Sequence, residues 1–195
     1  TCFTCIFNNE TQQTLMPSGN EHIVDSFQRR HNYLRISLTD KCNLRCRYCM
    51  PVEKMKFMPT ASLMQANEII DIAGEFNRWG VDKIRLTGGE PLIRKDVNQI
   101  LKGLAELPVE ISMTTNAYFL DEHVHLLRDS GVRHLNISLD TLKAERFLSL
   151  TRRNGLQKTL ENIKIAARHG FHVKLNVVLM KGINDDEILD FATFA

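Results

Sequence analysis

Short strand-like segments alternate with longer amphipathic segments from residue 33 to the last residue of the chain. The strand-like segments are 34–39, 83–87, 109–115, 133–139 and 172–180, and the helix-like segments are 62–79, 94–106, 121–130, 142–150, 156–169 and 185–195. Gly80, Gly131 and Gly170 follow three of the helical patterns, where a glycine commonly ends a helix. Alternation at this spacing predicts βαβ units, a parallel sheet and an α/β fold.

The strand-like segments are polar on one face and apolar on the other, whereas a parallel strand covered on both faces is apolar throughout. The polar positions are Arg35, Ser37 and Thr39; Lys83, Arg85 and Thr87; Ser112, Thr114 and Asn116; His134, Asn136 and Ser138; and His172, Lys174 and Asn176. We therefore expect a curled sheet, an incomplete TIM-type (β/α) barrel, with helices outside and a cationic lumen. An antiparallel sheet with one solvated face is the alternative, but the helices between its strands would have little to cover.

Composition fits one soluble domain at 33–195, preceded by a weakly patterned arm at 1–32. Of the 195 residues 43% are hydrophobic, and no apolar run is long enough to span a bilayer. The net charge of +2 is too balanced to indicate nucleic acid or a membrane surface as a partner. The five cysteines form two local groups, which favours metal or redox chemistry over a secreted disulfide framework.

One cysteine group, Cys42-x3-Cys46-x2-Cys49, directly follows the first predicted strand. It therefore belongs at the carboxyl edge of the sheet, where such folds hold their active sites. Three thiolates can ligate three irons of one [4Fe–4S] cubane and leave the fourth iron open, as a catalytic site requires. A zinc site lacking a fourth ligand and three unrelated buried cysteines are the alternatives, which the spacing and position disfavour. We interpret Cys2 and Cys5 as incidental.

Three further motifs end predicted strands at the same edge. They are Gly88-Gly89-Glu90-Pro91, Thr114-Thr115-Asn116 and Asn136-Ile-Ser138-Leu-Asp140. Glycine in the first motif lets a backbone approach a ligand closely, although the motif alone could be an ordinary tight turn. Because all three follow in order along one edge, together they indicate a binding site.

The cysteine spacing, with Tyr48 before the last cysteine, is similar to the signature of the radical S-adenosylmethionine (SAM) superfamily. The resemblance implies a [4Fe–4S] cluster whose open iron binds SAM, and reductive cleavage of SAM to a 5′-deoxyadenosyl radical. The cluster ligands it implies are Cys42, Cys46 and Cys49. The SAM contacts it implies are Tyr48, Gly89 and Ser138.

Residues 33–46, 83–94, 173–178 and 181–187 also resemble the N-terminal portion of the GTP 3′,8-cyclases of molybdenum cofactor (molybdopterin) biosynthesis. In that family the radical abstracts hydrogen from C3′ of GTP, and the sugar radical attacks C8 of the base. The GTP contacts that this resemblance implies are Arg35, Arg85, Thr114 and Lys174. All four fall on the polar face assigned from alternation, and their cations suit a triphosphate. Buried ion pairs with carboxylates elsewhere in the chain are the alternative for these cations.

The chain departs from the family pattern in three places. Ala117 stands where the family usually has glycine, and the stretch 52–57 is shorter than usual. The chain also stops before the family's C-terminal domain, which carries three cysteines for a second cluster that binds guanine. We therefore expect a fragment or truncated product of a longer enzyme, with an open sheet edge after the fifth strand.

Two other functions stay open at this stage. One is a radical SAM enzyme with a different substrate, such as a peptide; the other is a catalytically incomplete paralogue or splice product that binds a cluster, SAM or a partner. The cyclase resemblance implies GTP and an electron donor as partners, and it allows a homodimer. The first strand is more like the eukaryotic branch, which implies the mitochondrial matrix; a bacterial chain would be cytoplasmic.

Overall fold

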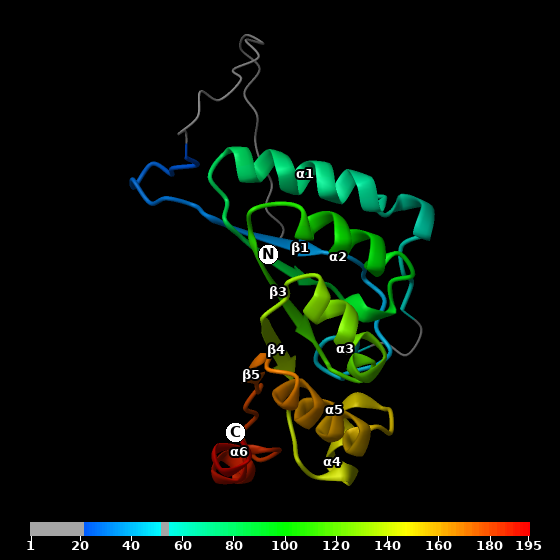
Figure 1. Ribbon diagram of the computed structural model, residues 1–195. Coiled ribbons are helices and arrows are strands. Elements are labelled where there is room, and N and C mark those ends of the chain that lie inside the picture. Colours follow the sequence, from blue (N-terminus) through cyan, green and yellow to red (C-terminus); the bar gives the residue numbers. More distant parts are fainter. Residues whose placement is uncertain (1–21, 52–54) are drawn as a thin grey trace.

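A computed structural model describes residues 22–51 and 55–195. Its centre is one parallel sheet whose five strands lie side by side in chain order (Figure 1). The strands are β1 (Tyr33–Ser37), β2 (Lys83–Thr87), β3 (Glu110–Thr115), β4 (His134–Ser138) and β5 (His172–Asn176). Within the described residues no further strand pairs with the outer edge of β5, so the sheet is an open, partial barrel, as predicted.

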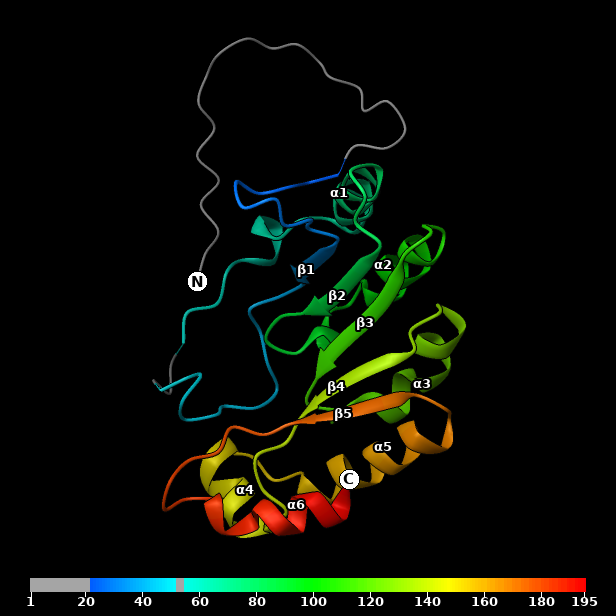
Figure 2. The same ribbon diagram turned by 90° about the vertical axis from the view of Figure 1, so that its left-hand side faces the viewer.

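Helices connect the strands and cover one side of the sheet. They are α1 (Ala66–Arg78), α2 (Val97–Ala105), α3 (Leu120–Asp129), α4 (Ala144–Thr151), α5 (Leu156–Arg168) and α6 (Ile188–Phe194), with short 3-10 helices at Thr60–Ser62, Pro91–Ile93 and Asp185–Glu187. Figure 2 shows α1, α2, α3 and α5 along one side of the sheet, and α4 and α6 near the carboxyl ends of β4 and β5. None of the described helices is long and apolar enough to cross a membrane.

The hydrophobic core fills the space between the sheet and these helices. The strands contribute alternate residues to it, and each helix contributes one apolar stripe. Fully buried members include Ile84, Leu86, Met113, Leu135 and Ile137 from the strands and Ile69, Ile100, Leu101, Leu104 and Leu127 from the helices. The apolar side of every strand therefore faces the helices, as the alternation predicted.

The opposite face of the sheet is polar and is not covered by helices. Arg35 lies opposite Arg85, and Arg85 lies opposite Ser112, so these side chains share one face. One pleat nearer the carboxyl edge, Thr114, Asn136 and Lys174 form a second row. The predicted strand phase is thus confirmed.

Several elements are shorter than predicted, and for β5 and α1 the cause is a side-chain hydrogen bond that competes with the element. β5 ends at Asn176 and not at residue 180, since the Val178 amide donates to Asp140 Oδ1 at 2.9 Å. Helix α1 begins at Ala66 and not at residue 62, because Glu68 Oε2 accepts the Gln65 amide at 2.6 Å in a capping box that fixes the start.

The segment 22–32 of the expected arm forms a turn in which Val24 pairs with Arg30. It contacts the sheet and α1 through Asn32 Nδ2, which donates to Asp82 Oδ1 at 2.8 Å, and the Ile23 amide, which donates to the Trp79 carbonyl at 3.3 Å. The interpretation of Cys2 and Cys5 concerns residues outside the described part of the chain, and so does that of residues 52–54 in the stretch 52–57.

Candidate active site at the carboxyl edge of the sheet

The loop after β1 carries the three clustered cysteines and is bound to the carboxyl end of α4. The Arg45 amide donates to the Thr151 carbonyl at 2.9 Å, and the Arg47 amide donates to the Leu150 carbonyl at 3.0 Å. These bonds satisfy carbonyls that a helix end leaves without internal partners. Cys42 and Cys46 are half-buried, whereas Cys49 is exposed at the surface.

The glycine pair after β2 holds the same loop from the other side. The Gly89 amide donates to the Thr39 carbonyl at 2.6 Å, and the Glu90 amide donates to the Lys41 carbonyl at 2.8 Å. A methyl group on Gly89 would collide with the Lys41 carbonyl. The structure therefore gives this glycine a role in a close approach between two backbones, just before Cys42; this role is additional to the SAM contact implied by the resemblance.

Glu90, the third residue of that motif, binds the end of β3. Its side chain is fully buried and accepts bonds from Thr115 Oγ1 at 2.7 Å, the Asn116 amide at 2.7 Å and the Leu92 amide at 3.2 Å. Burial raises the pKa of Glu90 to about 7, while these three donors oppose the shift. No lysine or arginine in the described residues forms an ion pair with it.

The raised pKa of Glu90 predicts a pH-dependent stability of the metal-free protein. Between pH 4.5 and 7 the folded state binds more protons than the unfolded state, so the free energy of unfolding falls as pH rises. We expect Glu90→Gln to remove this loss. The unfolding free energy of the variant minus that of the native protein should then increase by up to about 3 kcal/mol from pH 4.5 to pH 7. Urea unfolding at several pH values measures it, and a difference that stays constant with pH contradicts the prediction.

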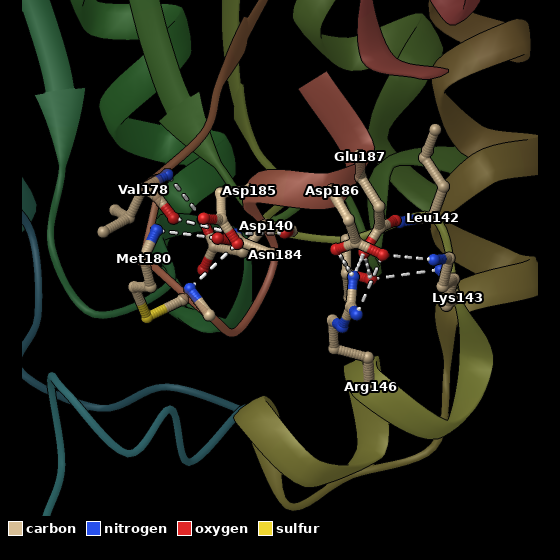
Figure 3. A network of polar contacts seen from close by, with 12 residues as sticks. Asp140, Leu142, Lys143, Arg146, Val178, Met180, Asn184, Asp185, Asp186 and Glu187 are labelled. Atoms are coloured by element: carbon tan, nitrogen blue, oxygen red, sulfur yellow. Dashed lines mark hydrogen bonds and ion pairs between the residues drawn. The ribbon is translucent and has the colours of Figure 1, made fainter. Parts of the chain in front are cut away.

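A second buried glutamate makes the same contacts at the end of β4 (Figure 3). Glu187 accepts bonds from Thr141 Oγ1 at 2.7 Å and the Leu142 amide at 2.6 Å, and Arg146 forms an ion pair with it. Burial acts to raise the pKa of Glu187, but these donors outweigh it, so its pKa lies below the usual range. The two glutamates thus hold two neighbouring strand ends, one with a cationic partner and one without.

Tyr48 connects the cysteine loop to the end of β4. Its hydroxyl donates to Asp140 Oδ2 at 2.6 Å, and burial together with this carboxylate raises the pKa of Tyr48. Asp140 also holds the loop after β5, because its Oδ1 accepts the Val178 amide and its carbonyl accepts Asn184 Nδ2 at 2.7 Å (Figure 3). Asp140 lies two residues after Ser138, so the contact brings the loop that carries Tyr48 to the strand end that carries Ser138.

The three cysteines suit a cubane better than a single metal ion. No three histidine, cysteine or acidic side chains of the described residues converge on one point, as the zinc alternative would require. A cubane takes one thiolate at each of three different irons. Burial raises the pKa of Cys46 to about 11, and the neighbouring Cys42 and Asp140 add to the shift; burial also raises the pKa of Cys42. Binding of a cluster at Cys42 and Cys46 would therefore release protons from their thiols.

The cations of the polar face have no carboxylate partners among the described residues. None of the ion pairs among the described residues involves Arg35, Arg85 or Lys174. Arg85 lies 5.5 Å from the centre of the Tyr33 ring, and its Nε donates to Ser112 Oγ at 3.3 Å. The ion-pair alternative is thus not supported, and the guanidinium groups are available to an anion.

The predicted site residues form two sets in the structure. Arg35 and Arg85 are adjacent across β1 and β2, while Thr114 and Lys174 share the next row with Asn136 between them. Lys174 stands three strands from Arg85, a backbone separation of about 14 Å in a flat sheet. The two arginines and Lys174 therefore come from opposite sides of the same sheet face.

Sequence reasoning missed the residues that hold the strand ends. Neither Glu187 nor Arg146 was a candidate, and Glu90 was noted only as part of a glycine motif. Ala117, noted as a departure from the family, has a φ of 61°. This left-handed conformation explains why glycine suits the position, and the Asn162 side chain supports it by donating to the Ala117 carbonyl at 2.8 Å.

The chain is similar in sequence to one protein family and to several characterised proteins. The model of the radical SAM superfamily matches residues 36–195. A GTP 3′,8-cyclase of Listeria monocytogenes is 49% identical over 173 residues, which are 87% of this chain and 52% of that protein. Molybdenum cofactor biosynthesis protein 1 of Drosophila melanogaster is 46% identical over 177 residues, 90% of this chain and 31% of that protein. The chain thus spans about half the length, or less, of these relatives.

Solved structures confirm the fold. SuiB of Streptococcus suis bound to S-adenosylmethionine superposes with a TM-score of 0.72 and 22% identity, over 84% of this chain and 37% of that one. HydG, a maturase of the [FeFe]-hydrogenase, superposes with a TM-score of 0.59 and 12% identity over 75% of this chain. At these identities the likeness concerns the arrangement of strands and helices only.

Proposed function

Because the chain belongs to the radical SAM superfamily, we propose that it carries the SAM-cleaving part of a GTP 3′,8-cyclase of molybdenum cofactor biosynthesis. Relatives with that activity in their names are 44–49% identical to it. The observation that carries the proposal is the pair Arg35 and Arg85. These adjacent guanidinium groups have no carboxylate partner among the described residues, and they lie on the sheet face whose carboxyl edge borders the cysteine loop.

Cys42, Cys46 and Cys49 would hold a [4Fe–4S] cluster, and their number and placement fit one. With SAM bound at its open iron, such a cluster supplies the electron that cleaves SAM and so yields the hydrogen-abstracting radical. Tyr48 and Ser138 lie on segments that the Asp140 contact joins, which suits a shared SAM site. Gly89 fixes the start of the cysteine loop, just before Cys42.

The chain's own residues would orient the substrate. Arg35 and Arg85 offer forked donors to phosphate oxygens, and Lys174 offers a point charge across the face. Thr114 lies between them and provides a hydroxyl near the carboxyl edge. Hydrogen abstraction needs near-contact between the reacting atoms, so fixing both the triphosphate and the cysteine loop on one sheet serves the reaction directly.

Three finer points are part of the proposal. An external electron donor reduces the cluster, and a homodimer remains a prediction. The relation to the eukaryotic branch, with the mitochondrial location that it implies, also stays a prediction, since bacterial and insect relatives are similarly close. A peptide substrate has no support beyond the fold likeness to SuiB, which has also been solved with its precursor peptide. A binding-only product is disfavoured because all three cysteines of the loop after β1 and the strand-end motifs are present.

Product analysis of one anaerobic reaction tests the proposal. The reconstituted chain, reduced with SAM and GTP present, should form 5′-deoxyadenosine, and GTP should change its rate of formation. Chromatography measures both this product and the cyclised nucleotide, with the full-length Listeria relative as positive control. Since the chain spans half of that relative, we expect 5′-deoxyadenosine without cyclised nucleotide. No 5′-deoxyadenosine from a chain that holds its cluster would contradict the proposal.

A further inference from the structure

The carboxamide of Asn116 lies between the cysteine loop and the end of β3. Its Nδ2 donates to Asn43 Oδ1 at 2.8 Å and lies 3.7 Å from Cys42 Sγ, within hydrogen-bonding distance for sulfur. Asn116 is buried, although the sequence pattern had placed it on the open polar face beyond Thr114. The reason is that β3 ends at Thr115, so the next residue turns toward the loop.

The orientation of this amide is set by its surroundings. Asn116 Oδ1 accepts the Tyr118 amide at 3.0 Å, and a backbone N–H can only donate, so Nδ2 must face the cysteine loop. The Asn116 backbone amide donates to buried Glu90 at 2.7 Å. Both ends of the residue are therefore fixed, and the carboxamide cannot turn away without leaving polar groups unsatisfied.

The contact matters most when Cys42 is a thiolate. As a thiol, Cys42 donates to Asn43 Oδ1 at 3.8 Å. On binding iron it loses that proton, and two acceptors then face each other. Asn116 Nδ2 carries two hydrogens, one for each acceptor, so it can hold both in place. A donor on a thiolate ligand also stabilises the negative charge that the cluster gains on reduction.

We propose that Asn116 is a positioning residue for the cluster, whose side-chain N–H donates to the Cys42 thiolate and raises the reduction potential of the bound [4Fe–4S] cluster. This inference rests on the proposed cluster, but not on GTP as the substrate. Glu90 acts through Asn116, since it holds the strand end from which the amide extends.

Redox titration of the reconstituted chain, followed by electron paramagnetic resonance, tests the role of Asn116. Asn116→Asp keeps the oxygen that accepts the Tyr118 amide but loses both donors. At the potential where the native cluster is half reduced, the ratio of reduced to oxidised cluster should fall about tenfold, which is 59 mV for a one-electron couple. Asn116→Ser loses the contact without adding a charge, and should shift the ratio in the same direction by less.

Asn162→Ala is the matched control. Asn162 is a buried asparagine whose Nδ2 donates to the carbonyls of Ala117 and Tyr118 in the same turn, at 2.8 and 3.0 Å. It therefore supports the turn without a bond to Cys42. We expect a lower melting temperature. At the potential where the native cluster is half reduced, the ratio of reduced to oxidised cluster should differ from the native ratio by less than about twofold. An unchanged potential in both Asn116 variants, or an equal shift in Asn162→Ala, overturns the role of Asn116. A native chain without a reducible cluster would overturn the proposed function itself.

Discussion

Cys46→Ala should reduce the iron content of the anaerobically reconstituted chain from about four atoms to background. Cys46 is half-buried between Cys42 and the turn that leads to Cys49, so alanine leaves one iron without a ligand where the loop offers no substitute. Cys42→Ala and Cys49→Ala should have the same effect. Because SAM cleavage needs the cluster electron, 5′-deoxyadenosine should disappear with the iron.

Cys2→Ala and Cys5→Ala are the controls for this result. The sequence interpretation makes both cysteines incidental, and they lie outside the described residues. Iron analysis and the visible absorption of the reconstituted proteins measure the outcome together. A chain that loses its iron equally in the Cys2→Ala or Cys5→Ala variants would show that the ligand set is wrong. Full iron retention in Cys46→Ala would also show that the ligand set is wrong.

The double variant Arg35→Ala/Arg85→Ala should weaken GTP binding at least a hundredfold. Each guanidinium group can make charge-assisted hydrogen bonds to phosphate oxygens, worth about 1.5–3 kcal/mol apiece. Neither group has an ion-pair partner to lose among the described residues, so the melting temperature should change little. Calorimetric titration of GTP into the reconstituted chain measures the affinity, and raised salt should reduce the difference between native and variant.

Lys83→Ala is the matched control for the arginines. Lys83 lies on the same strand and face as Arg85, but at the amino end of β2, one pleat further from the cysteine loop. We expect an effect below about tenfold, because a more distant exposed charge is largely screened. Arg85→Lys should fall between native and alanine, since an ammonium group cannot bind phosphate with a fork. Equal losses from Lys83→Ala and Arg35→Ala would indicate nonspecific attraction to a basic face.

The strand faces and the shared edge of the sheet could be predicted from the sequence, because they follow from regular patterns. Side chains alternate with a period of two along each strand, so the run around Arg35 and the run around Arg85 each define two faces without knowledge of the partner strand. Parallel pairing then places like faces together, and the register confirms it. The motifs after the strands also had to meet at one edge, because all parallel strands end on the same side.

The details that depend on tertiary contacts could not be predicted. β5 stops early because Asp140, distant in sequence, takes the Val178 amide. Glu90 and Glu187 look like ordinary acidic residues in the sequence, yet both are fully buried and bind strand ends. The position of Asn116 depended on where β3 ends, and boundaries are set by such side-chain competition more than by propensity. Alternation therefore extended the polar face two residues too far.

Transfer of hydrogen from GTP tests the central claim most directly. The reconstituted chain, reduced with SAM and GTP deuterated at C3′, should yield 5′-deoxyadenosine that carries deuterium, detected by mass spectrometry. Label in this product requires both the cluster on Cys42, Cys46 and Cys49 and a GTP molecule held within reach of it by the cationic face. GTP labelled at another ribose carbon is the control and should transfer nothing. Unlabelled 5′-deoxyadenosine at native yield would contradict GTP as the substrate of this site.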